Sequence, residues 1–285
     1  MATEPSPLGA LRSEIDEIDV EIQALLTKRA GVVDRVGRAK SGANPMRPGR
    51  EAVLLRRRLE AASEKMPTVV ISRIWREIIA AFCRAQGPLS VAVCAPEKSV
   101  GYWDLARDHF GSATPMSLHK SSRVVVQAVG AGDVSVGLLP VPQEDDPEPW
   151  WRYLAGAGPD RPRVIARLPF CANPGARFED LEALAIAMLD YDASGEDVSL
   201  LAVPASDRMS RASFNALVRE AGFDGHAVAA FDESGTEPGR LYLVEVFGYL
   251  EAGDPRMKGL EEKLGDQGGE VFHIGGYAKP IEGDS

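Results

Sequence analysis

The N-terminal part of the chain carries an apolar pattern with a helical period. In residues 8–40, LGALRSEIDEIDVEIQALLTKRAGVVDRVGRAK, apolar side chains recur at alternating steps of four and three. This 3.5-residue rhythm predicts one helix whose apolar seam faces another helix. At 1.5 Å per residue the helix would be roughly 50 Å long, so we expect much of it to pack outside its own chain's fold. The seam consists of Leu11, Ile15, Ile18, Ile22, Leu25, Val32, Val36 and Ala39.

A cation interrupts this seam. Arg29 stands in the gap between Leu25 and Val32. Arginines on long helices usually lie on solvated faces. At an apolar seam, however, an arginine costs free energy unless an anion or a hydrogen-bond partner meets it. The position therefore favours a ligand-binding role for Arg29.

Two shorter helices are predicted to follow the long one. Ser6 and Pro7 suit the N-cap and first position of the long helix, and Pro48 opens a second helix through Met66. A third helix is expected from near Pro67 to the Gly87-Pro88 stop. Its predicted apolar stripe is Val70, Ile74, Ile78 and Phe82.

Beyond residue 87 short apolar runs alternate with helical stretches. This alternation predicts an α/β unit with a partly parallel sheet over residues 88–195. Residues 196–285 predict the order β-α-β-β-α-β, a split βαβ layer. We thus expect three parts, an all-α region (1–87), an α/β unit (88–195) and an α+β domain (196–285). The strands expected in the α/β unit cover residues 90–95, 134–142, 163–170 and 183–191.

Composition narrows the function classes. The net charge of −10 and the pI near 5.0 argue against nucleic-acid binding and against adhesion to anionic membranes. No apolar run reaches the length of a membrane span, and the first ten residues lack the pattern of a signal peptide. Three scattered cysteines suit a reducing compartment, and neither they nor the four histidines form a metal-ligand pattern. We therefore expect a cytoplasmic protein without a metal site.

Charged and polar residues of the three helices could converge on one ligand. Arg29 and Lys40 are three helical turns apart and project from one face, while Arg50 and Glu51 lie in the first turn of the second helix. Gln86 ends the third helix. Arginine forks grip carboxylates at two points, so this set suits a small dianion that carries a hydroxyl.

A further arginine could join the site only across a dimer. Arg12 precedes Arg29 by seventeen residues, roughly 25 Å along the same helix. If two copies paired their long helices antiparallel, each copy could lend its Arg12 to the other's site.

These residues resemble the all-helical chorismate mutase family, in the form fused to prephenate dehydratase in bacteria. The resembling motifs are LRSEIDEID from Leu11, the Arg29 position, VGRAK ending in Lys40, RPGREA from Arg47, and WREII before Gln86. The resemblance implies an interlocked helical homodimer. It also implies that chorismate is isomerised to prephenate without a cofactor.

The resemblance also implies roles for the residues that bind the substrate carboxylates. Arg12 would reach the site of the other subunit, and Arg29 would hold a carboxylate. Arg50 would line the site near the ring carboxylate.

At the reacting atoms, the family pattern implies that Lys40 and Gln86 bond to the ether oxygen of the breaking bond. Glu51 would accept a hydrogen bond from the substrate hydroxyl. The chain departs from the family at Phe82, where some members have serine, and this side chain would narrow the site.

The C-terminal two-thirds resembles a degenerate prephenate dehydratase followed by an ACT regulatory domain. The stretch APEKS from Ala95 stands where the dehydratase family has GPxGT, and the segment around Pro140 lacks the asparagine of a VPIEN-like motif. FNALV from Phe214 and DESG from Asp232 stand where relatives carry phenylalanine-binding motifs. The ACT-like domain is therefore a possible site for an amino-acid effector, and otherwise a dimer-forming scaffold.

Three alternatives to a chorismate mutase stay open at this point. The first is a working bifunctional mutase and dehydratase, and the second is a related pericyclic enzyme acting on isochorismate or aminodeoxychorismate. The third is a non-catalytic regulator of the aromatic pathway that uses its helical arm to dimerise. The third is disfavoured because a dimerisation arm needs no arginine at its seam.

Overall fold

The computed structural model describes most of the chain. The described residues are 7–39, 44–62, 65–95, 100–144, 146, 149–156, 158, 160–172, 175–176, 180–233 and 239–281. Ser6 and Lys40 lie outside them, so the predicted N-cap and one predicted catalytic residue have no structural account.

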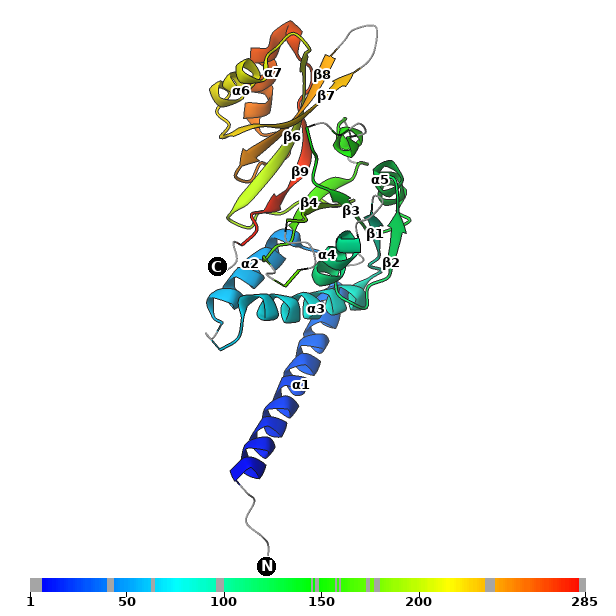
Figure 1. Ribbon diagram of the computed structural model, residues 1–285, viewed down its shortest axis with the longest axis vertical. Helices are drawn as coiled ribbons and strands as arrows, with labels where there is room; N and C mark the ends of the chain where they lie inside the picture. Colours follow the sequence, from blue (N-terminus) through cyan, green and yellow to red (C-terminus); the bar gives the residue numbers. More distant parts are fainter. Residues whose placement is uncertain are drawn as a thin grey trace, which may run out of the picture.

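The first helix is an arm that projects from the rest of the molecule (Figure 1). Helix α1 (Pro7–Ala39) contains no buried residue. Its seam is open to solvent, with Leu11 57% and Leu25 64% exposed. The sequence predicts a long helix that packs outside its own chain's fold. In the single chain, α1 does project away from the rest of the fold.

Helix α3 (Thr68–Gln86) packs against the base of the arm, and α2 (Pro48–Glu60) packs against α3. Helix α2 ends six residues before the predicted Met66, and Pro67 disfavours helical backbone at Met66 itself. The apolar stripe predicted for α3 is not the face that this chain buries, since Val70 and Ile74 are 40% and 44% exposed. The buried face instead consists of Ser72, Arg76, Ile79, Ala80 and Cys83.

The described residues after α3 form one nine-stranded sheet in the order β2-β1-β3-β5-β4-β9-β6-β8-β7. Strand β1 pairs parallel with β2 and β3, whereas β5 pairs antiparallel with β3 and β4, which makes the α/β unit partly parallel as predicted. Strand β2 was not predicted, because MSLH is short and only partly buried. The strands of this half are β1 (Val91–Cys94), β2 (Met116–His119), β3 (Val136–Pro140), β4 (Arg163–Leu168) and β5 (Ala183–Ala187). Its helices are α4 (Val100–Phe110), α5 (Ser122–Gly130) and the short η1 (Trp150–Leu154).

The C-terminal half has the predicted order of strands and helices. Its elements are β6 (Asp197–Ser206), α6 (Arg211–Glu220), β7 (Gly225–Glu233), β8 (Gly239–Phe247), α7 (Pro255–Leu264), η2 (Gly265–Gln267) and β9 (Phe272–Ala278). In the sheet these strands run β9-β6-β8-β7, and each pair within the set is antiparallel. This is the split βαβ layer expected from the sequence.

The two halves of the sheet meet between β4 and β9, which pair in parallel at Val164 and Gly275. Gly275 has a φ of +113°, and a Cβ there would lie 2.2 Å from the Val164 carbonyl oxygen. The junction therefore depends on a residue without a side chain.

The helical region and the sheet share one hydrophobic core. Leu55 of α2 and Ile79 of α3 pack in the same cluster as Val91, Leu138 and Ile165 of the sheet. Helices α2 and α3 are thus built into the α/β unit, whereas α1 is not. Among the described residues, no helix has both the length and the apolar character needed to cross a membrane.

We predict that Gly275→Ala destabilises the fold by roughly 2–5 kcal/mol, because both the positive φ and the contact with Val164 become unfavourable. Gly248→Ala is the matched control, since Gly248 has a φ of +103° but open space around its Cα. The control should lose roughly 1–3 kcal/mol of stability, because only the positive φ is unfavourable for alanine there. Thermal unfolding of both variants measures the difference, and equal losses would contradict the close approach at the sheet junction.

Candidate active site

Arg29 lies where α1 leaves the body of the protein and faces α3. Its guanidinium carbon stacks 4.4 Å from the centroid of the Phe82 ring. Its Nη1 atom is buried and has no hydrogen-bond partner among the described residues. Burial lowers the pKa of Arg29, and the nearby Cys83 opposes this shift. A partly buried cation with a buried, unpaired donor atom is suited to bind an anion.

Gln86 lies at the contact between α1 and α3, opposite Gly37. Its Nε2 donates to the Phe82 carbonyl oxygen at 3.0 Å, within α3. A Cβ at Gly37 of α1 would lie 3.3 Å from Gln86 Cγ, so the two helices meet closely here. The amide nitrogen carries a second hydrogen, which can still bond to a ligand.

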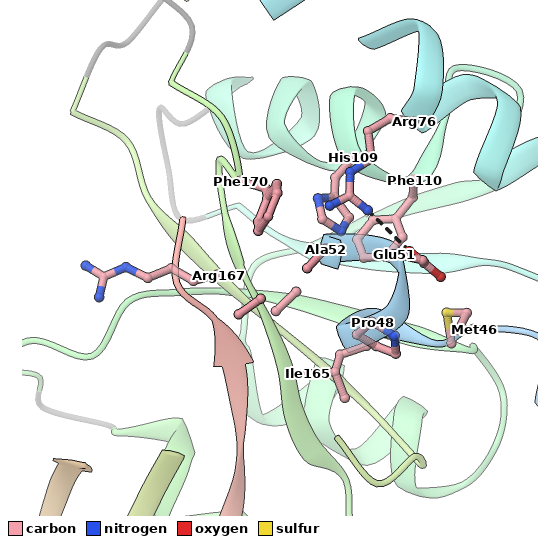
Figure 2. A pocket seen from close by; sticks show the side chains of 12 residues that line it. Met46, Pro48, Glu51, Ala52, Arg76, His109, Phe110, Ile165, Arg167 and Phe170 are labelled. Atoms are coloured by element: carbon pink, nitrogen blue, oxygen red, sulfur yellow. Dashed lines mark hydrogen bonds and ion pairs between the residues drawn. The ribbon is translucent and has the colours of Figure 1, made fainter. Parts of the chain in front are cut away.

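Glu51 is turned towards a buried arginine that received no role from the sequence. Its Oε2 accepts from Arg76 Nη1 at 3.2 Å (Figure 2). Its Oε1 accepts from the Arg47 backbone N–H at 3.1 Å. Only 6% of the Arg76 side chain is exposed. Burial lowers the pKa of Arg76 to about 10, while the Glu51 carboxylate opposes the shift. The pair fixes the Glu51 side chain between α2 and α3.

A pocket lies on the sheet side of this ion pair (Figure 2). It has an empty volume of about 390 Å³, part of which opens to solvent. His109 lies beside Arg76, and burial together with that arginine holds its pKa well below the usual range. Its imidazole is therefore neutral near pH 7. The Arg167 guanidinium points away from the other lining residues in Figure 2. The rest of the lining is mainly apolar, with Met46, Pro48, Ala52, Phe110, Ile165, Ala166, Phe170 and Ala278.

Within one chain, the structure brings together part of the predicted set. Arg29 stacks on Phe82, and Gln86 lies against Gly37, so both belong to the contact between α1 and α3. Glu51 pairs with Arg76 of α3. Arg12 and Arg50 are exposed. Lys40 lies outside the described residues. Arg12 and Arg29 belong to one straight helix, so they remain roughly 25 Å apart and cannot serve one small ligand within a chain.

Arg76 is the residue that sequence reasoning missed. It sits three, four and seven positions before Ile79, Ala80 and Cys83, all on the buried face of α3. A cation on an apolar helical stripe is the same signal that marked Arg29. The face of α3 that carries Arg76 is a second apolar face, distinct from the predicted stripe of Val70, Ile74, Ile78 and Phe82.

Comparison with known proteins agrees with the motifs of the helical region. Residues 11–87 match the family model described as chorismate mutase type II. The bifunctional chorismate mutase/prephenate dehydratase of Stutzerimonas stutzeri is 31% identical over 146 residues, which are 49% of this chain and 40% of that protein. The protein of that name from Aquifex aeolicus strain VF5 is 33% identical over 140 residues, 47% of this chain and 38% of that protein. The chain thus spans less than half the length of these curated relatives.

Among solved structures, a prephenate dehydratase from Arthrobacter aurescens in complex with L-Phe aligns with 68% of this chain and 92% of its own. The TM-score is 0.46 and the identity 11%, a likeness too weak to carry an argument about this chain. The similarity that bears on function is therefore that of the helical segment, residues 11–87, which match the chorismate mutase type II family.

Proposed function

We propose that the protein is a chorismate mutase, which converts chorismate to prephenate in aromatic amino-acid biosynthesis. The observation that carries the proposal is Arg29, a partly buried cation inside the segment that matches the family, whose buried Nη1 donor has no hydrogen-bond partner among the described residues. Chorismate carries two carboxylates and a hydroxyl, which is the ligand chemistry that the converging cations favour.

The proposed reaction needs positioning and charge stabilisation. One carbon–oxygen bond breaks as one carbon–carbon bond forms within the same molecule, and no proton or electron is exchanged with the protein. Arg29 holds a substrate carboxylate, while Lys40 and Gln86 donate to the ether oxygen as negative charge develops on it. Arg50 lies near the ring carboxylate. No cofactor is required by these steps.

The Glu51 contacts are compatible with its proposed role. Each carboxylate oxygen can accept more than one hydrogen bond, and Arg47 and Arg76 supply one donor to each in this chain. Capacity remains for the substrate hydroxyl. Arg76 then acts as the residue that orients Glu51.

The proposed enzyme is a homodimer whose long helices pair along their seams. The seam of α1 and the predicted stripe of α3 both leave large apolar side chains exposed in the single chain. Antiparallel pairing would cover them, and it would place Arg12 of each subunit at the site of the other.

For the C-terminal part we propose a degenerate dehydratase-like unit (residues 88–195) and an ACT-like domain (residues 196–285). The match to the Stutzerimonas stutzeri protein extends over 146 residues, which is longer than the mutase segment. The split βαβ order of β6 to β9 is compatible with an ACT-like domain that binds an amino-acid effector. The cytoplasmic location is also part of this proposal.

The direct test of the function is incubation of the pure protein with chorismate, with loss of chorismate absorbance followed and the product identified. We expect prephenate. Absence of turnover at micromolar protein would refute the mutase proposal, and phenylpyruvate as the product would instead support a bifunctional enzyme.

Arg29→Ala should lower kcat/KM for chorismate by roughly a hundredfold or more, because the buried donor to the substrate is lost. Arg38→Ala is the control on the same helix, since Arg38 is exposed and pairs with Asp34 at 2.7 Å. The control should retain activity. Normal turnover by Arg29→Ala would show that the site is placed wrongly.

Mixing two inactive variants tests whether the site is shared between subunits. Arg12→Ala and Arg29→Ala homodimers should each be nearly inactive. After unfolding and refolding together, the mixed dimer should contain one site with both arginines, so activity should return. If the mixture stays as inactive as its components, Arg12 does not act across the interface.

A further inference from the structure

A loop from the C-terminal half is bonded to the first turn of α2. The loop covers residues 188–196, between β5 and β6. Asp192 Oδ1 accepts from the Gly49 backbone N–H at 3.0 Å, and Asp192 Oδ2 accepts from Arg47 Nε at 3.1 Å. The N-cap residue of α2, Arg47, makes no side-chain cap of its own. Asp192 therefore caps α2 although it lies more than a hundred residues away in sequence. Its negative charge is also favoured by the helix dipole at the N-terminus of α2.

The contact between this loop and α2 is close enough to exclude a side chain. A Cβ at Gly49 would lie 1.9 Å from the Asp192 carbonyl oxygen and 2.8 Å from that of Ala193. Gly49 is buried, and its φ is not in the left-handed region, so its role is to allow this approach and not to relieve a strained backbone.

A second clamp lies two turns further along the same face of α2. Arg56 Nη1 donates to the Ser194 carbonyl oxygen at 3.2 Å and to Ser194 Oγ at 3.0 Å. Its Nη2 donates to the carbonyl oxygens of Glu196 and Lys279, both at 3.0 Å. One side chain thus joins α2 to the loop and to the end of β9.

The loop itself is held rigidly at the start of β6. The buried Asp197 carboxylate accepts from the Ser194 N–H at 2.9 Å and the Gly195 N–H at 3.0 Å, and also from the Tyr191 hydroxyl. Asp197 is in turn paired with Ala278 of β9. A carboxylate that accepts from this many donors fixes the backbone around it. Because Asp197 belongs to the sheet and its donors lie on both sides of Asp192, the sheet determines where Asp192 lies.

The first turn of α2 contains two residues of the proposed mutase site. Arg50 follows Gly49 directly. Glu51 Oε1 accepts from the backbone N–H of Arg47, the residue whose guanidinium is paired with Asp192. A short chain of contacts therefore runs from the sheet through Asp192 and Arg47 to Glu51.

We propose that Asp192 is a positioning residue: it anchors the first turn of α2 to the C-terminal sheet and thereby places Arg50 and Glu51 for the mutase reaction. Its effect on catalysis rests on the proposed function, whereas the anchoring of α2 does not. The C-terminal half then helps to position residues of the mutase site, whether or not it has a catalytic activity of its own.

The test compares three variants of the full chain. Asp192→Ala should lower kcat/KM for chorismate about tenfold or more, since a small displacement of substrate-contacting groups has effects of that size. Asp192→Asn retains an acceptor for the Gly49 N–H and should recover part of the loss. Asp190→Ala is the control, because Asp190 lies in the same loop, is 89% exposed and pairs with Arg163 instead of α2. If Asp192→Ala matches the control in both kcat and KM, the proposal is overturned.

Gly49→Ala separates positioning from helix stability. Alanine favours a helix more than glycine does. If only the stability of α2 mattered, Gly49→Ala would therefore be at least as active as the parent protein. Positioning predicts the opposite, because the new Cβ must push the loop away from α2. Unchanged kcat/KM in Gly49→Ala would overturn the proposal.

Hydrogen exchange distinguishes failure of this proposal from failure of the proposed function. Amides of residues 49–52 should exchange faster in Asp192→Ala than in the parent and in Asp190→Ala, with the unfolding midpoints measured alongside. If the parent does not convert chorismate, the mutase function is refuted and this exchange result alone decides the anchoring. Equal exchange in all three proteins would refute the anchoring even in an active enzyme.

Discussion

The exposed apolar seam of α1 is the constraint on which the account depends. Full burial of a Leu or Ile side chain contributes roughly 1.5–3 kcal/mol, so a helix that leaves such residues about half exposed along its length is not at its most stable alone. The same helix holds Arg29 with an unused buried donor. A second copy could cover the seam and complete the site in one step. Dimerisation and catalysis would then have a common structural cause.

The body of the protein fixes the rest of the site. Helices α2 and α3 share their core with β1, β3 and β4, and α2 is bonded to the loop before β6. Glu51 is consequently held from two directions, by Arg76 on α3 and by the capped first turn of α2. The arm supplies Arg29, and the sheet determines where α2 lies. The helical region is therefore more than a domain attached to the sheet by a linker.

Much of the fold followed from the sequence where local patterns were strong. The 3.5-residue seam predicted α1, and Pro48 and Gly87 marked where α2 begins and α3 ends. The β-α-β-β-α-β order was evident from alternating apolar runs. Strand β2 escaped prediction because MSLH has few buried positions. The buried face of α3 escaped prediction because it carries Ser72 and Arg76 among its apolar residues, whereas the predicted stripe is exposed in the single chain. Contacts over long sequence separations, such as Asp192 with Gly49, leave no local pattern at all.

Specific activity measured over a dilution series, with the mass of the particle determined by sedimentation at each concentration, tests the central claim most directly. We predict that activity per chain falls at the concentrations where the dimer dissociates, because a monomer lacks the second subunit's Arg12. Full activity per chain in a solution that sedimentation shows to be monomeric would contradict it.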